Sequence, residues 1–140
     1  MTSMRFERQV PIRFGHCDPA GIVFFPQYFV LFNGLVEDWV SDALGIPYAE
    51  LIGVRRIGLP TVSLATDFRA VSRMGEIVSF GLSVERLGTR SFTLALDCRH
   101  DGKERVSARH VIVSTDLDTH RAVALPADLR NAIERFRGAP

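Results

Sequence analysis

Apolar and polar side chains alternate along five stretches of the chain, which is the pattern of strands with one buried face. The first stretch, residues 5–14, places four apolar side chains on one face: Phe6, Val10, Ile12 and Phe14. Pro11 within it indicates an edge strand or a bulge, because proline cannot donate a hydrogen bond to a neighbouring strand. Four later stretches show the same alternation: residues 60–71, 76–87, 91–99 and 103–115. We therefore predict five strands.

Residues 28–44 follow a different period. Pairs of apolar residues alternate with pairs of polar or small residues, so that the pattern repeats every four residues. This spacing predicts a long helix with a broad buried face. Pro26 suits its first turn, and Gly45 followed by Pro47 ends it. Gly34 inside the helix costs about 1 kcal/mol relative to alanine, so we expect a neighbouring backbone to pass close to it.

The links between the later strands are short and turn-like, at Met74-Gly75, at Gly88-Thr89 and at Asp101-Gly102. Asp-Gly between two alternating stretches is a strong hairpin signal, and short links require an antiparallel meander. One long helix cannot cover two faces, so we expect it to lie across one face of a sheet of about five strands in an α+β domain. Residues 126–136 add a short C-terminal helix. A second copy of the chain is expected to cover what remains.

The chain has 140 residues, of which 46% are hydrophobic, which predicts one domain over residues 1–140. Lys and Arg number 17 and Asp and Glu 16, for a net charge of +1. No strongly basic block occurs, which disfavours nucleic acid as a partner.

Cys17 and Cys98 provide neither a disulfide framework nor a metal-ligand spacing, and we expect both to be reduced thiols. The first ten residues lack the apolar core of a secretion signal. The apolar stretches are shorter than the roughly 20 residues that cross a bilayer, so no membrane association is expected. These features predict a cytoplasmic protein.

The stretch "HCDPAGIVFFPQYF", residues 16–29, combines an acid with a helix start. Asp18-Pro19 begins a turn, and Gly21 permits an unusual backbone geometry. The first N–H groups of a helix lack internal partners and attract negative charge, so those near Phe25 could form an oxyanion hole for an attacked acyl carbonyl. A carboxylate beside aromatic side chains is poorly solvated, which would raise the basicity of Asp18. The alternative is that Asp18 only starts a turn and the aromatic residues are core.

The segment "GHCDPAGIVFFPQYF" resembles the signature of the 4-hydroxybenzoyl-CoA thioesterase family in the hot-dog superfamily. The resemblance extends over nearly the whole chain, through "GLPTVSLATDF", "RSF" and "LPADLRNAI". It implies a hot-dog fold, in which a five-stranded antiparallel sheet wraps around one long helix. It also implies homodimers, often paired into homotetramers, with active sites between chains. Asp18 would then be the catalytic carboxylate, and the backbone N–H of Phe25 would polarise the thioester carbonyl.

The resemblance predicts an acyl-CoA thioesterase acting on a short or aromatic acyl group. Asp18 would either attack the carbonyl to form a mixed anhydride or activate a water, and both routes stay open. No metal or cofactor is required, since coenzyme A is part of the substrate. Seven further residues are expected to bind substrate: His16, Gly21, Phe24, Tyr28, Thr61, Arg86 and Arg90. His16 stands where the nearest aromatic-acyl relatives carry an acid, and Arg86 and Arg90 represent a thinner basic cluster for the CoA phosphates.

Two alternatives belong to other classes. One is a hot-dog domain that binds acyl-CoA without catalysis and has no need of Asp18. The other is a hot-dog dehydratase, which is disfavoured because the long helix carries Glu37 and Asp38 but no histidine. The histidines after residue 99 are scattered and form no metal-ligand pair, and His110 is expected to be a strand residue with a local hydrogen bond. The acyl group, and whether CoA or a protein carries it, stay open.

Overall fold

The computed structural model describes residues 4–138. Its helices are α1 (Phe25–Asp38), α2 (Tyr48–Gly53) and α3 (Ala127–Phe136). Its long strands are β1 (Phe6–Pro11), β3 (Thr61–Phe68), β4 (Ile77–Leu87), β5 (Ser91–His100) and β6 (Lys103–Val113). Three two-residue strands, β2 (Ile57–Gly58), β7 (Thr115–Asp116) and β8 (Arg121–Ala122), form a small second sheet. The five predicted strands and the predicted C-terminal helix are thus confirmed. The predicted long helix is confirmed in part, because α1 ends at Asp38 and a π turn (Trp39–Ala43) follows it.

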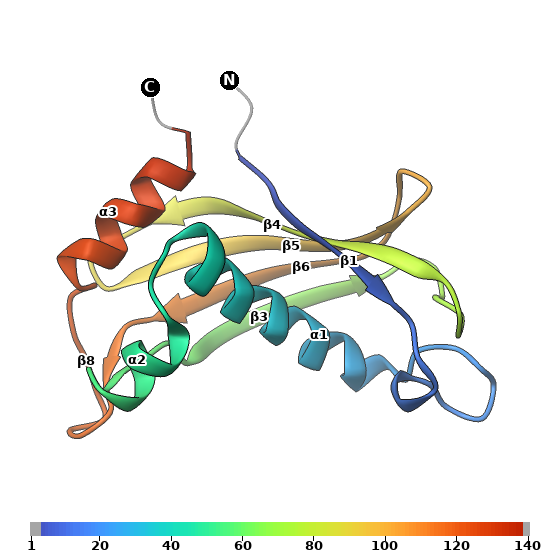
Figure 1. The fold of residues 1–140 in the computed structure, drawn as a ribbon, viewed down its shortest axis with the longest axis horizontal. Helices are drawn as coiled ribbons and strands as arrows, with labels where there is room; N and C mark the ends of the chain where they lie inside the picture. Colours follow the sequence, from blue (N-terminus) through green and yellow to red (C-terminus); the bar gives the residue numbers. More distant parts are fainter. Residues whose placement is uncertain (1–3, 139–140) are drawn as a thin grey trace.

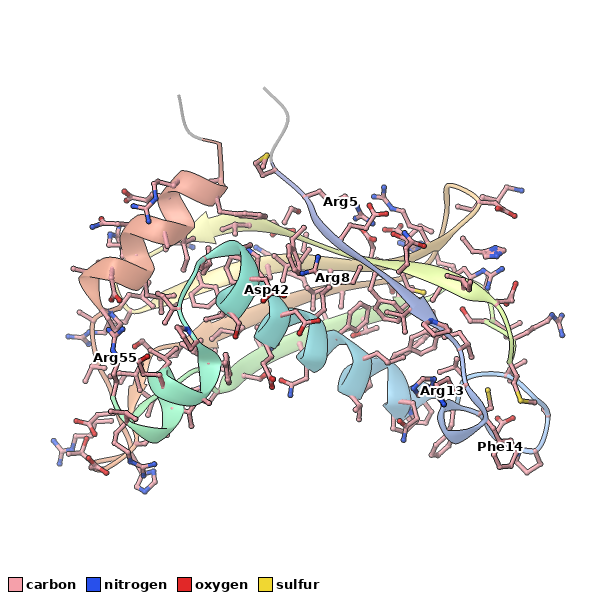
Figure 2. The ribbon with its side chains drawn as sticks, in the orientation of Figure 1. Arg5, Arg8, Arg13, Phe14, Asp42 and Arg55 are labelled. Atoms are coloured by element: carbon pink, nitrogen blue, oxygen red, sulfur yellow. The ribbon has the colours of Figure 1, made fainter. Side chains whose placement is uncertain are left out.

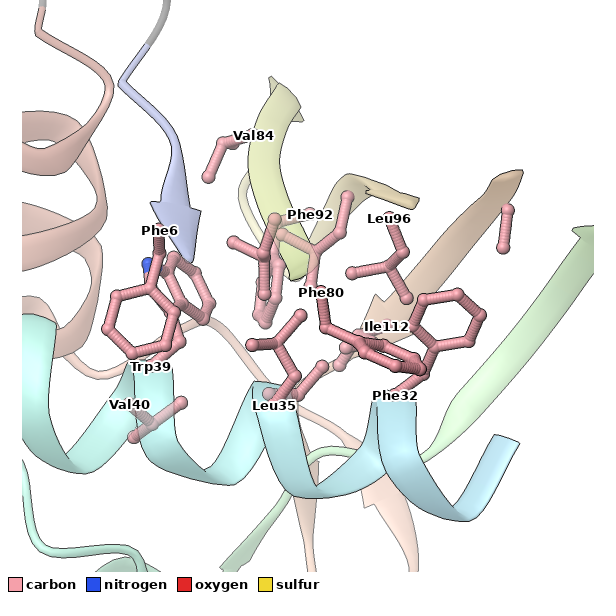
Figure 3. Close-up of a cluster of buried hydrophobic side chains, with 14 of the residues drawn as sticks. Phe6, Phe32, Leu35, Trp39, Val40, Phe80, Val84, Phe92, Leu96 and Ile112 are labelled. Carbon is pink, nitrogen blue, oxygen red and sulfur yellow. The ribbon is translucent and has the colours of Figure 1, made fainter. Parts of the chain in front are cut away.

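The long strands form one antiparallel sheet in the order β1-β4-β5-β6-β3, and α1 crosses one face of it (Figure 1). Pro11 lies on the edge strand β1, as predicted. Side chains of α1 and of the turn that follows it pack against the sheet around Trp39, Phe80 and Phe92, each at most 1% exposed (Figure 3). The resulting α+β layer places the start of α1 at the end of the sheet where β3 ends and β4 begins.

The predicted meander is correct for β4, β5 and β6 but wrong for β3. β3 pairs with β6, with Leu64 opposite His110, and lies at the far edge of the sheet from β1. The link between Phe68 and Ile77 therefore crosses the end of the sheet instead of forming a hairpin. Its first two N–H groups, from Arg69 and Ala70, donate to the carbonyl oxygen of Arg105 at 2.7 and 3.1 Å. This crossing carries residues 71–76 to the start of α1.

Two local expectations are also wrong. Phe14 does not share the buried face of the first strand: the chain leaves β1 after Pro11 and enters a 3-10 turn (Phe14–His16), which leaves Phe14 80% exposed. No backbone of the described chain passes close to Gly34, because a Cβ placed there would meet nothing within 4 Å. The long helix ends as expected at Gly45, which has a φ of +73°, after a π turn (Trp39–Ala43).

Candidate active site

The loop between β1 and α1 folds back on itself beside the start of α1. Cys17 forms an isolated antiparallel bridge with Val23. The N–H of Asp18 donates to the carbonyl oxygen of Ile22 at 3.0 Å, and the N–H of Phe24 donates to that of His16 at 2.9 Å. Figure 2 labels Arg13 and Phe14 at the corner of the molecule where this loop adjoins the helix. The fold of the loop thus keeps Asp18 close to the first turn of α1.

Asp18 is half-buried as a residue, and its carboxylate is partly engaged by its own loop. Its Oδ1 accepts a hydrogen bond from the N–H of Ala20 at 2.8 Å, in the turn that Asp-Pro sequences favour. Gly21, which follows, has a φ of +78°, a conformation that a residue with a side chain rarely adopts. Oδ2 accepts no hydrogen bond from any residue between 4 and 138, and no cation there pairs with Asp18. One carboxylate oxygen is therefore available for chemistry.

The start of α1 offers one free backbone N–H. Phe24 donates to His16, Pro26 has no N–H, and Gln27 donates to the carbonyl oxygen of Phe24 at 2.8 Å. The N–H of Phe25 has no acceptor in the described part of the chain. The sequence led us to expect several such groups, but the proline and the tight first turn reduce them to one. The helix dipole adds partial positive charge at this N–H.

The crossing link between β3 and β4 supports the loop from behind. The N–H of Val23 donates to the carbonyl oxygen of Ser72, and the N–H of Met74 donates to that of Gly21, both at 3.0 Å. Arg105 clamps the end of this link through Glu76, whose carboxylate accepts two guanidinium hydrogen bonds at 2.8 and 3.0 Å. Those bonds lower the pKa of Glu76 from its usual 4.5 to about 2. The loop therefore rests on a segment that is itself anchored to the sheet.

A cavity of about 260 Å³ opens at the start of α1. Its walls include Phe25, Tyr28, Phe68 and Arg69. The ring of Phe68 stands edge-on to that of Phe25, with 6.1 Å between centroids, and the ring of Tyr28 lies 6.0 Å away. Asp18 does not line this cavity but lies in the loop that precedes Phe25. An apolar cavity beside a free N–H is a setting in which an acyl group can be held for attack.

A second cavity, of about 360 Å³, lies further along α1, between the helix and strands β3, β5 and β6. Thr61 lines it, and its Oγ1 is 2.6 Å from Nε2 of His110. His110 is 7% exposed, and burial lowers its pKa. The prediction that His110 is a strand residue is confirmed, but its hydrogen bond is not local, because it reaches Thr61 on the neighbouring strand β3.

The remaining expected site residues fall into two groups. His16 and Phe24 flank the loop. Nδ1 of His16 accepts a hydrogen bond from the N–H of Arg13 at 2.9 Å. Phe24 is 49% exposed, and its ring packs edge-on against the ring of Phe25. Arg86 and Arg90, near the turn between β4 and β5, lie at the opposite end of the sheet from α1's first turn (Figure 1). Within one chain, these arginines are not brought to Asp18.

The site also includes residues that the sequence did not single out. Phe68 and Val71 line the cavity at the helix start, because β3 lies beside β6 and its link crosses the end of the sheet. The alternation of residues 60–71 shows only that Phe68 is on the same face as Leu64. Arg69 also lines this cavity. The missing signal was the strand order.

Across residues 4–138 no cluster of three or more histidine, cysteine, aspartate or glutamate side chains could hold a metal ion. In the same range, no helix is both long and apolar enough to cross a bilayer.

Comparisons with known proteins place this architecture in one family. Residues 12–133 match the model of the thioesterase-like superfamily. The 1,4-dihydroxy-2-naphthoyl-CoA hydrolase of Prochlorococcus marinus (strain MIT 9313) is 28% identical over 134 residues, covering 88% of this chain and 85% of that protein. The 4-hydroxybenzoyl-CoA thioesterase of Pseudomonas sp. (strain CBS-3) is 26% identical over 132 residues, covering 86% and 91%.

Solved structures agree with the sequence relatives. That of a gentisyl-coenzyme A thioesterase superposes with a TM-score of 0.83 at 26% identity, covering 91% of this chain and 99% of that one. A 1,4-dihydroxy-2-naphthoyl-CoA thioesterase from Synechocystis gives 0.85 at 21% identity, covering 97% and 99%, which supports the fold. The chain belongs to the thioesterase-like superfamily, with the hot-dog arrangement that its sequence suggested. It is an enzyme of the thioester hydrolase class.

Proposed function

We propose that this protein hydrolyses a short or aromatic, hydroxybenzoyl-like acyl-CoA to the free acid and CoA. The observation that carries the proposal is the single free N–H of Phe25, which lies beside the loop of Asp18 and on the wall of an apolar cavity. The matched relatives support it, since their names describe hydrolysis of aromatic acyl-CoA thioesters.

In the proposed reaction, the N–H of Phe25 binds the thioester oxygen and stabilises the negative charge that develops on it. Asp18 either attacks the carbonyl carbon, forming a mixed anhydride that water then cleaves, or takes a proton from the attacking water. Either route breaks the carbon–sulfur bond and releases CoA as the thiol. The turn from Asp18 to Ala20 and the support of the crossing link hold the carboxylate in place.

The test is Asp18→Asn, assayed by thiol release from a panel of acyl-CoA thioesters. Asparagine keeps the oxygen that accepts from Ala20, so the loop should keep its fold while the charge is lost. We expect kcat/KM to fall by about a thousandfold or more, because a nucleophile or base has been removed.

Asp101→Asn is the matched control, because this exposed hairpin aspartate has a φ of +52°, which asparagine tolerates, and it lies outside the site. It should leave turnover unchanged. Binding of acyl-CoA by wild type and Asp18→Asn alike, with no Asp18-dependent turnover of any thioester in the panel, would support the non-catalytic binder instead.

We further propose that the working unit is a homodimer paired through β3. This edge strand exposes apolar side chains, with Val62 at 59%, Leu64 at 42% and Phe68 at 48%, and an apolar unpaired edge favours association. Antiparallel pairing of two β3 strands about a twofold axis turns the second chain end for end. The partner's Arg86 and the partner's Arg90 would then lie at the same end of the dimer as Asp18, where they could bind the phosphates of CoA.

A further inference from the structure

The half-buried ring of His16 closes the turn that leads into the loop of Asp18. The backbone N–H of Arg13 donates to Nδ1 of His16 at 2.9 Å. In return, the N–H of His16 donates to the carbonyl oxygen of Arg13 at 3.0 Å. The 3-10 turn (Phe14–His16) is thus held by two hydrogen bonds between the same two residues, and Nδ1 is engaged within the chain.

The same histidine joins this turn to the start of α1. Its carbonyl oxygen accepts a hydrogen bond from the N–H of Phe24 at 2.9 Å, and Phe24 is the residue that precedes the first turn of α1. Asp18 follows His16 by two positions, and Phe25 follows Phe24. The two groups of the proposed reaction therefore extend from the two sides of this one hydrogen bond, and their relative position depends on the geometry at His16.

The hydrogen bond to Nδ1 requires an uncharged ring. A backbone N–H can only donate, so Nδ1 must keep its lone pair, and the proton of the neutral ring is on Nε2. In the protonated ring both nitrogens carry a proton, and neither can accept. Protonation of His16 therefore breaks this hydrogen bond and leaves the N–H of Arg13 facing a second N–H.

The charged surroundings of His16 provide no partner for a protonated ring. Five titratable or charged side chains lie on its turn, on the loop that follows and on the crossing link behind them: Arg13, Cys17, Asp18, Arg73 and Glu76. The carboxylate of Glu76 is already paired with Arg105. Among residues 4–138, the ion pairs between a histidine and a carboxylate belong to His100 alone. A charge on His16 would therefore weaken the turn without forming a new ion pair.

Resting on the proposed function, we infer that His16 is a positioning residue whose uncharged ring holds Asp18 in place against the N–H of Phe25. When the ring takes up a second proton, the turn is released and the two groups lose their alignment. The rate of hydrolysis therefore falls on the acid side as His16 becomes charged, because misplaced reacting groups cost rate.

The first experiment compares His16→Asn with His16→Gln, using the thioester that wild type hydrolyses fastest. Oδ1 of asparagine is as many bonds from the backbone as Nδ1 and can accept from Arg13, whereas glutamine places its oxygen one bond further out. His16→Gln should lower kcat by about ten- to hundredfold with little change in KM. His16→Asn should recover most of that kcat. Equal losses in the two variants would overturn the inference.

The pH dependence of kcat tests the role of the charge. In wild type, the loss of kcat on the acid side should share its midpoint with the second protonation of the His16 ring, followed by NMR of the ring nitrogens. In His16→Asn this loss should move to lower pH, since asparagine takes up no proton. An acid-side loss that is the same in His16→Asn as in wild type would assign it to another group and contradict the inference.

His120→Asn is the matched control. His120 is exposed in the turn between β7 and β8, where its φ of +59° suits asparagine, and it lies outside the site. This variant removes a titrating ring without touching the loop of Asp18. It should therefore leave kcat and its pH dependence unchanged.

An NMR titration of wild type separates failure of this inference from failure of the proposed function, which fails if no thioester is hydrolysed. A scalar coupling across the hydrogen bond should join the amide nitrogen of Arg13 to Nδ1 of His16 while the ring is uncharged. The coupling should vanish as the ring takes up its second proton, and the amide of Phe24 should lose protection from hydrogen exchange over the same range. Absence of the coupling, or protection of Phe24 that does not follow the charge on His16, would refute the inference whatever the protein hydrolyses.

Discussion

At the scale of single residues, Glu76 joins two parts of the chain that form the site. Its carboxylate accepts from Arg105 on β6 and from the backbone N–H of Arg73 at 2.6 Å, so the crossing link is tied to the sheet. Its side chain is 23% exposed, which leaves the pair less screened by water than a surface ion pair. The position of the Asp18 loop therefore depends on a charge outside the cavity.

Glu76→Gln should lower the free energy of unfolding at pH 7 by about 1–3 kcal/mol. The pKa of Glu76 is about 2 in the folded chain and 4.5 as usual when unfolded, so the unfolded state takes up the proton first as the pH falls. The stabilisation is thus full above about pH 5 and is lost between roughly pH 5 and pH 2. Urea unfolding of wild type and Glu76→Gln at several pH values measures the difference in the free energy of unfolding. This difference should vanish at the acid end of the range.

Glu85→Gln is the control for this measurement. Glu85 pairs with Arg109 at 3.0 Å on the outer face, and its side chain is 42% exposed. An exposed pair of this kind contributes little, so the variant should resemble wild type at every pH. Equal effects of the two substitutions would contradict the special role given to Glu76.

At the scale of elements, two glycines of similar surroundings serve different purposes. A Cβ would meet nothing within 4 Å at either Gly21 or Gly34. Gly21 has a φ of +78° in the loop of Asp18, whereas Gly34 lies in the middle of α1. The first is required by backbone geometry, and the second only weakens the helix.

Alanine substitutions should therefore have opposite effects on the free energy of unfolding. Gly21→Ala should lower it by about 1–2 kcal/mol, because a side chain is disfavoured at positive φ. Gly34→Ala should raise it by about 0.5–1 kcal/mol through helix propensity. Chemical denaturation measures both. A loss of stability in Gly34→Ala would show that a second chain packs closely against this part of α1.

At the scale of the whole molecule, a single chain leaves the apolar edge strand β3 uncovered and does not bring Arg86 and Arg90 to Asp18. β3 exposes Val62, Leu64 and Phe68. The turn between β4 and β5, next to Arg86 and Arg90, lies at the other end of the sheet from the start of α1 (Figure 1). A dimer through β3 would address both features. The pairing of dimers into tetramers stays a prediction of the family resemblance.

Val62→Lys should convert the proposed dimer into monomers, because a charged side chain on an edge strand opposes strand pairing. Light scattering coupled to size-exclusion chromatography measures the mass of the particle. The kcat/KM of the monomeric variant should be lower than that of wild type. Val54→Lys is the control, since Val54 is 77% exposed at the end of α2 and is not part of β3. A wild-type monomer with full activity would contradict the dimer.

Local sequence patterns were sufficient for most elements. Alternation identified all five long strands, and the four-residue period located the long helix, although it starts at Phe25 rather than Tyr28. The short helix α2 and the strands β2, β7 and β8 went unpredicted, since segments of two to six residues are too short to show a period. The stretch around Asp18 was recognised because its turn, glycine and helix start are adjacent in sequence.

The sequence by itself determined the fold class and the loop that carries Asp18, because both rest on patterns of residues close along the chain, and its motifs resembled those of one family. Only the tertiary structure decided that β3 pairs with β6, that the link after Phe68 supports this loop, and that Thr61 meets His110 across two strands. Strand order depends on which apolar faces pack together over long separations, and no local period records that choice. Cavities and buried polar pairs follow from the strand order, so they too appear only in the folded chain.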